Sequence, residues 1–135
     1  MSGPHELLNP PALAPPRGFS HAVAAAPGRI VYIGGQAGMD SGWKLVEGGL
    51  VAQFDAAAAN VVTALAAAQG EPRHLVQIHI FVTSAADYRA ALEPLGKSWR
   101  RHFGRHYPAV ALFEVAGLFE PGALVELTGV AVVPP

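Results

Sequence analysis

The chain has no cysteine and few charged side chains, and both absences narrow the possible functions. Without cysteine there is no disulfide, no thiolate nucleophile and no thiolate metal ligand, which fits a reducing compartment. Charged residues are only 14% of the chain, the formal net charge is -1, and no basic run occurs. Nucleic acid is therefore not expected as a partner, because its phosphates would meet no positively charged surface.

Long apolar runs are also missing, and we expect no signal peptide in residues 2–16. No uninterrupted apolar run reaches the roughly 18 residues that a membrane-spanning helix needs. Residues 2–16 are rich in proline and lack a cationic start followed by an apolar core. We therefore expect a cytoplasmic protein with no membrane partner.

The composition predicts one domain that associates with copies of itself. A chain of 135 residues has the size of one compact domain. Prolines crowd the stretch from Pro4 to Pro16, where they cannot donate hydrogen bonds to a sheet. We expect residues 1–17 to form an N-terminal arm and residues 18–135 to form the domain. Hydrophobic residues are 51% of the chain, which leaves apolar surface to cover and favours self-association.

The spacing of apolar residues and turn residues predicts the elements of this domain. Residues 19–25 and 30–35 are β-prone runs around the turn dipeptide Pro27-Gly28, which predicts a hairpin. The remaining patterns predict, in chain order, a helix over 51–69, a strand over 75–83, a helix over 85–103 with a kink or break at Pro94, and strands over 110–115 and 123–132.

This order of strand, strand, helix, strand, helix, strand, strand predicts an α+β fold. Two helices are enough to cover one face of a mixed sheet. The other face then needs a partner, and a second copy of the chain is the simplest one. We therefore expect a closed homo-oligomer.

A search by residue type finds little catalytic chemistry. No serine lies in a nucleophile elbow, and no histidine pair has the helical spacing of a zinc site with a carboxylate to complete it, so no metal site is predicted. The glycine pair Gly34-Gly35 fits tight packing at a strand end or exposure of backbone amides to a ligand, and both remain open. Solvated surface roles are the simplest explanation of His5, His21, His102 and His106.

An ordered set of short segments resembles the Rid (YjgF-like) family of imine deaminases. The similarity runs from about Phe19 to Val132 in the family's order. It is carried by residues 19–23, 30–36 and 76–82, Gln53 and Asn60, Pro108-Ala109, Glu114-Val115, and residues 122–127. Single segments are weak signals, whereas the ordered set is specific.

The resemblance implies a chorismate-mutase-like α+β fold and a homotrimer with ligand clefts between subunits. In the family's deaminases a reactive enamine or imine is hydrolysed to a 2-keto acid and ammonia, without cofactor or metal. A small molecule bound between subunits is thus the expected ligand.

The resemblance also suggests roles for individual residues. It implies Phe19 as the aromatic wall of the cleft, Gly35 as the glycine whose backbone contacts the ligand, and Glu126 as the catalytic carboxylate that orients water. Gln36 beside Gly35, and Leu112 on the strand that follows Pro108-Ala109, are further substrate-binding candidates. From strand alternation alone, Glu126 fits a solvent-facing role equally well.

One position departs from the family pattern in a way that affects the chemistry. Val110 stands where the deaminases have the arginine that holds the substrate carboxylate. A charge-assisted grip of that kind contributes about 1.5 to 3 kcal/mol, or roughly ten- to hundredfold in affinity. Another arginine could replace the missing one, although a solvated surface role explains each candidate. The candidates are Arg17, Arg100, Arg101 and Arg105.

Three functions follow as hypotheses. The first is a Rid-type protein without deaminase activity, which binds a small, less anionic imine, enamine or amide-like metabolite and hydrolyses or tautomerises it with Glu126. The second is a non-catalytic, ligand-binding or chaperone-like trimer. The third is a conventional 2-iminobutanoate/2-iminopropanoate deaminase that uses another cation in place of the missing arginine.

Overall fold

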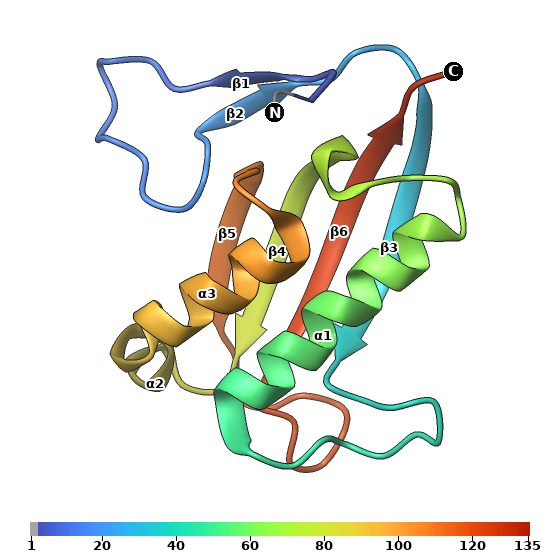
Figure 1. Ribbon diagram of the computed structural model, residues 1–135. Helices are drawn as coiled ribbons and strands as arrows, with labels where there is room; N and C mark the ends of the chain where they lie inside the picture. The colour runs from blue at the N-terminus through green and yellow to red at the C-terminus, as the bar shows by residue number, and fades with distance from the viewer. Residues whose placement is uncertain (1–2) are drawn as a thin grey trace.

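A mixed four-stranded sheet forms the centre of the molecule (Figure 1). We analysed a computed structural model that describes residues 3–135. The strands are β3 (Arg29–Ala37), β4 (Leu75–Val82), β5 (Ala109–Glu114) and β6 (Val125–Val133). They lie in the order β3-β6-β4-β5, with β6 antiparallel to both neighbours and β4 parallel to β5. The predicted α+β architecture is confirmed.

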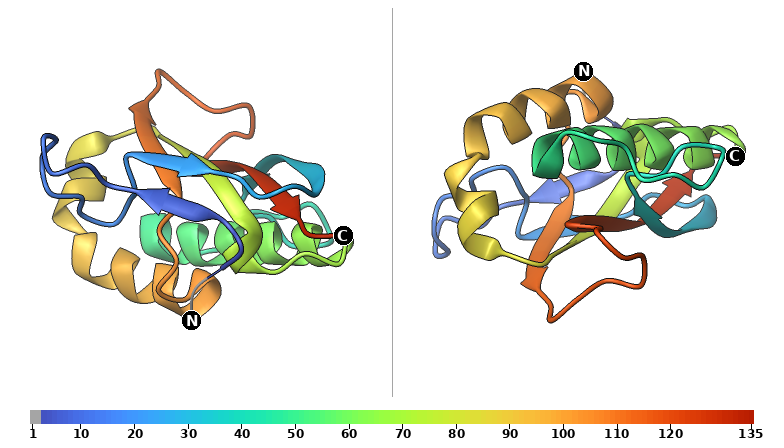
Figure 2. Two further views of the ribbon diagram at one scale, coloured as in Figure 1. Left: turned by 90° about the horizontal axis from the view of Figure 1, so that it is seen from above. Right: turned by 90° about the horizontal axis from the view of Figure 1, so that it is seen from below.

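All helices lie on one side of this sheet, as the sequence predicted (Figure 2). They are α1 (Gly49–Ala66), α2 (Ala85–Ala90) and α3 (Leu92–Phe103), with a 3-10 turn over Pro72–His74. The core lies between the sheet and helices α1 and α3. Its fully buried side chains include Phe54, Val61, Leu65, Ile78, Val82 and Leu127.

Helix α1 forms because alanine favours helix and because larger apolar residues recur along one face. By length and composition alone it also meets the requirement for a membrane span. Its face with Phe54, Val61 and Leu65 is buried against the sheet, which is the position of a core helix.

The N-terminal hairpin differs from the prediction. Strand β2 (Ala22–Ala24) pairs with β1 (Glu6–Leu8) inside the proline-rich arm and does not pair with β3. His5, just before β1, is buried: its Nε2 lies 2.8 Å from the carbonyl oxygen of Val132, and its Nδ1 accepts from the Ala26 amide at 3.0 Å. These contacts tie the arm and the end of β2 to the end of β6. The predicted hairpin and the solvated role for His5 are both wrong.

The second helical region is divided earlier than predicted. The break falls at Ala91, with φ -115° and ψ 22°, between α2 and α3. Pro94 lies in the first turn of α3, where a backbone N–H has no helical acceptor and its loss costs nothing. The region is therefore broken, as one of the two alternatives predicted, but the break lies before Pro94 and the proline belongs to the start of α3.

The face of the sheet opposite the helices is apolar and accessible in the single chain. Ile30, Tyr32 and Phe113 are 59%, 77% and 42% exposed there. Phe81 stacks on Phe113 with ring centroids 5.5 Å apart, and His79 meets Phe113 edge-on at 5.4 Å. We call this surface the open face; it is the uncovered surface that the element order predicted.

Candidate functional site

Glu126 lies over an irregularity in the edge strand β3. The register between β3 and β6 shifts between Ile33 and Gln36. A Cβ built on Gly35 would lie only 2.9 Å from Cδ of Glu126, so only glycine leaves room for the carboxylate to lie across the bulge. Gln36 folds back, and its Nε2 donates to the carbonyl oxygen of Gly34 at 3.2 Å. We call Gly35, Gln36 and Glu126 the bulge site.

The Glu126 carboxylate is available for chemistry. Within residues 3–135 it forms no hydrogen bond and no ion pair, and its side chain is partly buried. It is paired across the ladder with Phe81, whose neighbours Ile80 and Val82 point into the core. Because side chains alternate along a strand, Glu126 points to the open face.

Val110 and Leu112 lie on the other side of the sheet. Val110 pairs with the core residue Ile78 and packs against the core cluster. Together with Phe19, both residues line a cavity of about 850 Å³ between β5, α3 and the loop that joins β1 to β2. We call it the arginine cavity, because its lining includes Arg17, Arg100 and Arg105.

The loop that carries Phe19 is held against the edge of β5. The Ser20 amide donates to the carbonyl oxygen of Pro108 at 2.9 Å, and Ser20 Oγ donates to that of Tyr107 at 2.7 Å. Asn9 Nδ2 in turn donates to Ser20 Oγ at 3.3 Å. These bonds fix one wall of the arginine cavity to the strand that provides another.

The six predicted site residues thus form two groups within one chain. Phe19, Val110 and Leu112 lie together in the arginine cavity, whereas Gly35, Gln36 and Glu126 form the bulge site. Val110 and Glu126 point to opposite faces, and β4 separates their strands. A single chain therefore does not bring the two groups together.

The sequence patterns did not identify three aromatic residues that line the arginine cavity, Tyr88, Trp99 and Tyr107. They placed Tyr88 and Trp99 on the apolar face of a helix. Trp99 Nε1 donates to the carbonyl oxygen of His106 at 3.1 Å, and its ring stacks on Tyr107 at an interplanar angle of 10°. Burial raises the pKa of Tyr88 to about 12, so its phenol stays neutral at physiological pH. The cavity thus combines apolar walls with neutral and cationic polar groups.

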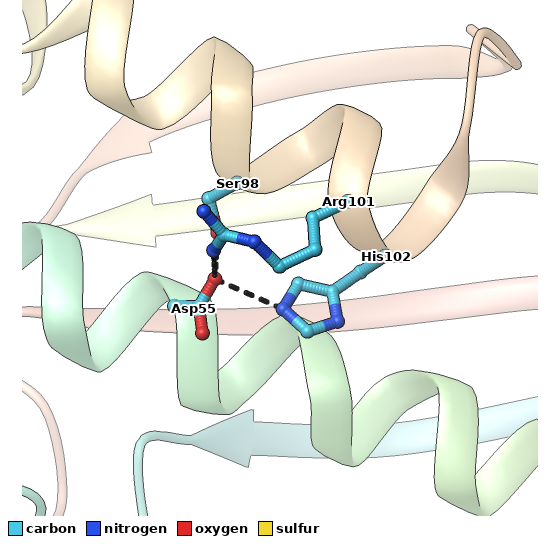
Figure 3. A network of polar contacts seen from close by, with 4 residues as sticks. All are labelled: Asp55, Ser98, Arg101 and His102. Atoms are coloured by element: carbon cyan, nitrogen blue, oxygen red, sulfur yellow. Dashed lines mark hydrogen bonds and ion pairs between the residues drawn. The ribbon is translucent and has the colours of Figure 1, made fainter.

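A polar network joins α1 to α3 beside this cavity (Figure 3). Asp55 Oδ1 accepts from Ser98 Oγ at 2.6 Å, lies 2.9 Å from His102 Nε2, and forms an ion pair with Arg101. Burial raises the pKa of Asp55, but the hydrogen bonds from Ser98 and His102 and the charges of His102 and Arg101 outweigh it, so the net pKa is lowered. Ser98 precedes Trp99, so the network holds in place the helix that lines the cavity.

Two further histidines are structural. His102 belongs to the Asp55 network, and His106 Nε2 lies 2.8 Å from the carbonyl oxygen of Leu75. Burial lowers the pKa of His106 despite that hydrogen bond. The surface role predicted for both is wrong. In the described part of the chain, no three acidic or histidine side chains are grouped to hold a metal ion.

The chain resembles known proteins along almost its whole length. Residues 10–133 match the family model described as Endoribonuclease L-PSP. Protein DfrA of Myxococcus xanthus is 32% identical over 129 residues, which cover 95% of this chain and 92% of that protein. The 2-iminobutanoate/2-iminopropanoate deaminase of Capra hircus is 32% identical over 124 residues, which cover 91% and 83%.

Solved structures share the fold. A Yersinia pestis protein of unknown function from the conserved Rid protein family, YyfB, superposes with a TM-score of 0.87 at 28% identity, over 96% of this chain and 99% of that one. RidA from an Antarctic Psychrobacter species gives a TM-score of 0.68 at 27% identity, over 89% and 92%. The predicted chorismate-mutase-like fold is confirmed.

Proposed function

Because the chain belongs to the Rid (YjgF/L-PSP) family, we propose that it binds a small metabolite between two of its copies and acts on it with Glu126. The substrate contains an imine, enamine or amide-like bond. In hydrolysis of an imine, a water oxygen bonds to the imine carbon, and Glu126 takes a proton from that water. The carboxyl returns this proton to the nitrogen, which gives an amino alcohol. Glu126 then moves the hydroxyl proton to the same nitrogen, the C–N bond breaks to release ammonia, and the C=O bond forms.

The availability of the Glu126 carboxylate carries this proposal. A carboxylate that is partly buried, yet without a hydrogen-bond or ion-pair partner in residues 3–135, is free to exchange protons with a ligand. Gly35 keeps the space beneath it open.

The division of the predicted site residues between two faces of the sheet supports a ligand site that two copies of the chain form together. The bulge site belongs to β3 and β6, whereas the arginine cavity lies at β5, the opposite edge of the sheet. A second copy that covers the open face would bring the β3 edge of one chain towards the β5 edge of its neighbour. A closed ring of three copies, the homotrimer that the resemblance implies, repeats this contact at each interface.

The test is hydrolysis of imines generated in solution from amino acids by an amino-acid oxidase. The panel contains 2-iminobutanoate, 2-iminopropanoate and neutral imines, with ammonia release as the readout. We expect Glu126→Gln to lower turnover by about a hundredfold or more. The matched control, Glu120→Gln, removes the same charge from the loop before β6 and leaves turnover unchanged.

The same panel separates the alternatives. Turnover of the two 2-imino acids well above the solvent background would identify the conventional deaminase, which the arginines of the cavity favour. Calorimetric binding without turnover would identify the non-catalytic trimer. Equal turnover by the native protein and Glu126→Gln would refute the role of Glu126.

A further inference from the structure

We propose that the arginine cavity selects an anion with a bulky apolar or aromatic body, and that Arg17, Arg100 and Arg105 hold the anionic group. This inference deepens the proposed function, because it names the ligand class of the cavity that contains Val110. In the family's deaminases the positive charge lies at the position of Val110, whereas here we place it on three other arginines of the cavity. The inference also predicts ligands larger than the three- and four-carbon imino acids.

The charge of the cavity is unusual for this chain. The whole protein has a formal net charge of -1, yet three of its seven arginines line one cavity. No Asp or Glu is among the lining residues in the part of the chain that the structure describes. None of the three arginines forms an ion pair within residues 3–135. Positive charges that line one cavity without a counter-charge favour the binding of an anion there.

Glycine lies close to two of the three arginines. Gly96 lies inside α3, where glycine costs about 1 kcal/mol relative to alanine. A Cβ there would lie 3.3 Å from Arg100 Nη1, so the guanidinium lies close against this turn of the helix. Gly18 has φ 73°, a conformation that lets the chain turn between Arg17 and Phe19.

The walls fit an apolar body. Phe19, Trp99 and Tyr107 line the cavity, and Trp99 is oriented by its bond to the His106 carbonyl and its stacking on Tyr107. Val110 adds an aliphatic surface where an arginine would fill space. A volume of about 850 Å³ lies in the range of sites for drug-sized ligands. A ligand the size of pyruvate would leave most of these walls wet.

The experiment is calorimetric titration of the full-length protein with three probes. Phenylpyruvate has both the anion and the aromatic body, pyruvate has only the anion, and phenylacetone has only the body. We expect phenylpyruvate to bind at least tenfold more tightly than either of the others. Its affinity should also fall as salt rises, because exposed charges are screened.

Variants of the three arginines test which of them contact the anionic group of the ligand. Arg17→Gln, Arg100→Gln and Arg105→Gln should each weaken phenylpyruvate binding roughly tenfold to a hundredfold. Arg89→Gln is the matched control, since Arg89 carries the same charge on α2 but does not line the cavity. Thermal unfolding and light scattering check that each variant keeps its fold and assembly.

The outcomes of the two tests are distinguishable. Absence of phenylpyruvate binding, or equal binding by the three variants and the Arg89 control, overturns this inference whatever the imine turnover. It would do so, for example, if a neighbouring copy filled the cavity. Phenylpyruvate binding that depends on these arginines supports it even if Glu126→Gln turns over imines as the native protein does, a result that would refute only the catalytic role.

Discussion

On the helix-covered face of the sheet, Ile78, Val82 and Leu127 are buried within one chain, whereas on the open face the apolar side chains of Tyr32 and Phe113 stay accessible. Both faces are built from alternate residues of the same strands. The difference shows that the chain has more apolar surface than its helices cover. One face therefore stabilises the single chain, and the other is available to a partner.

The strongest test of this comparison uses one phenylalanine from each side. Phe54→Ala removes a fully buried ring and should lower the free energy of unfolding by about 3 to 5 kcal/mol. Phe113→Ala, on the open face, should cost about 1 kcal/mol in dilute protein, because its ring is already partly hydrated. Urea unfolding followed by tryptophan fluorescence measures both. Equal losses would mean that the open face belongs to the core of the single chain.

A charge on the open face sharpens the comparison further. Tyr32→Glu should weaken self-association by about 2 kcal/mol, or roughly thirtyfold, because the new carboxylate would have to be desolvated in the interface. Sedimentation analysis over a range of concentrations measures this change. Trp43→Glu is the control, since Trp43 is also highly exposed, at 71%, but lies outside the sheet. A Tyr32→Glu protein that associates like the native one would argue for an interface elsewhere.

The smallest expected effect concerns the covered side. Asp55→Asn should lower the free energy of unfolding by about 0.5 to 1 kcal/mol at neutral pH, since the pair is partly solvated. Folding lowers the pKa of Asp55 from its usual 3.8, so the stabilisation is complete above that pH and is lost as the pH falls through the folded pKa.

Unfolding of the Asp55→Asn variant at pH 7 and pH 2.5 checks this expectation. The two proteins should differ at pH 7, and the difference should be smaller at pH 2.5, below the usual pKa of 3.8. Glu93→Gln, which breaks the more exposed pair with Lys97, should change stability less. A difference that persists unchanged at pH 2.5 would show that packing, and not charge, is responsible.

Local patterns predicted the elements better than their partners. The helix over 51–69 and the strand over 75–83 lie close to α1 and β4, because period and alanine content are local signals. The pairing of β2 was missed because the buried contact of His5 with Val132 joins residues far apart in the sequence. Proline also concealed β1, which occupies a short stretch of the arm without proline.

The candidate site shows the same limit. The likeness of separate segments located Phe19, Gly35, Val110 and Glu126, but which face each side chain points to depends on the register with β4 and β6. That register is set by long-range pairing. Arg17 lines the same cavity as Arg100 and Arg105 because the arm folds over β5. No local sequence pattern encodes that long-range contact.

The loop between β1 and β2 has a consequence for how such a protein can change over generations. Its residues 10–18 are exposed and belong to no sheet, while Asn9 and Ser20 fix its ends. Insertions or deletions between these ends would resize the arginine cavity without disturbing β6 and Glu126. On the proposed roles, one wall of the cavity that selects the ligand and the carboxylate that acts on it therefore reside in separate stretches of the gene, and selection is free to alter the first while keeping the second.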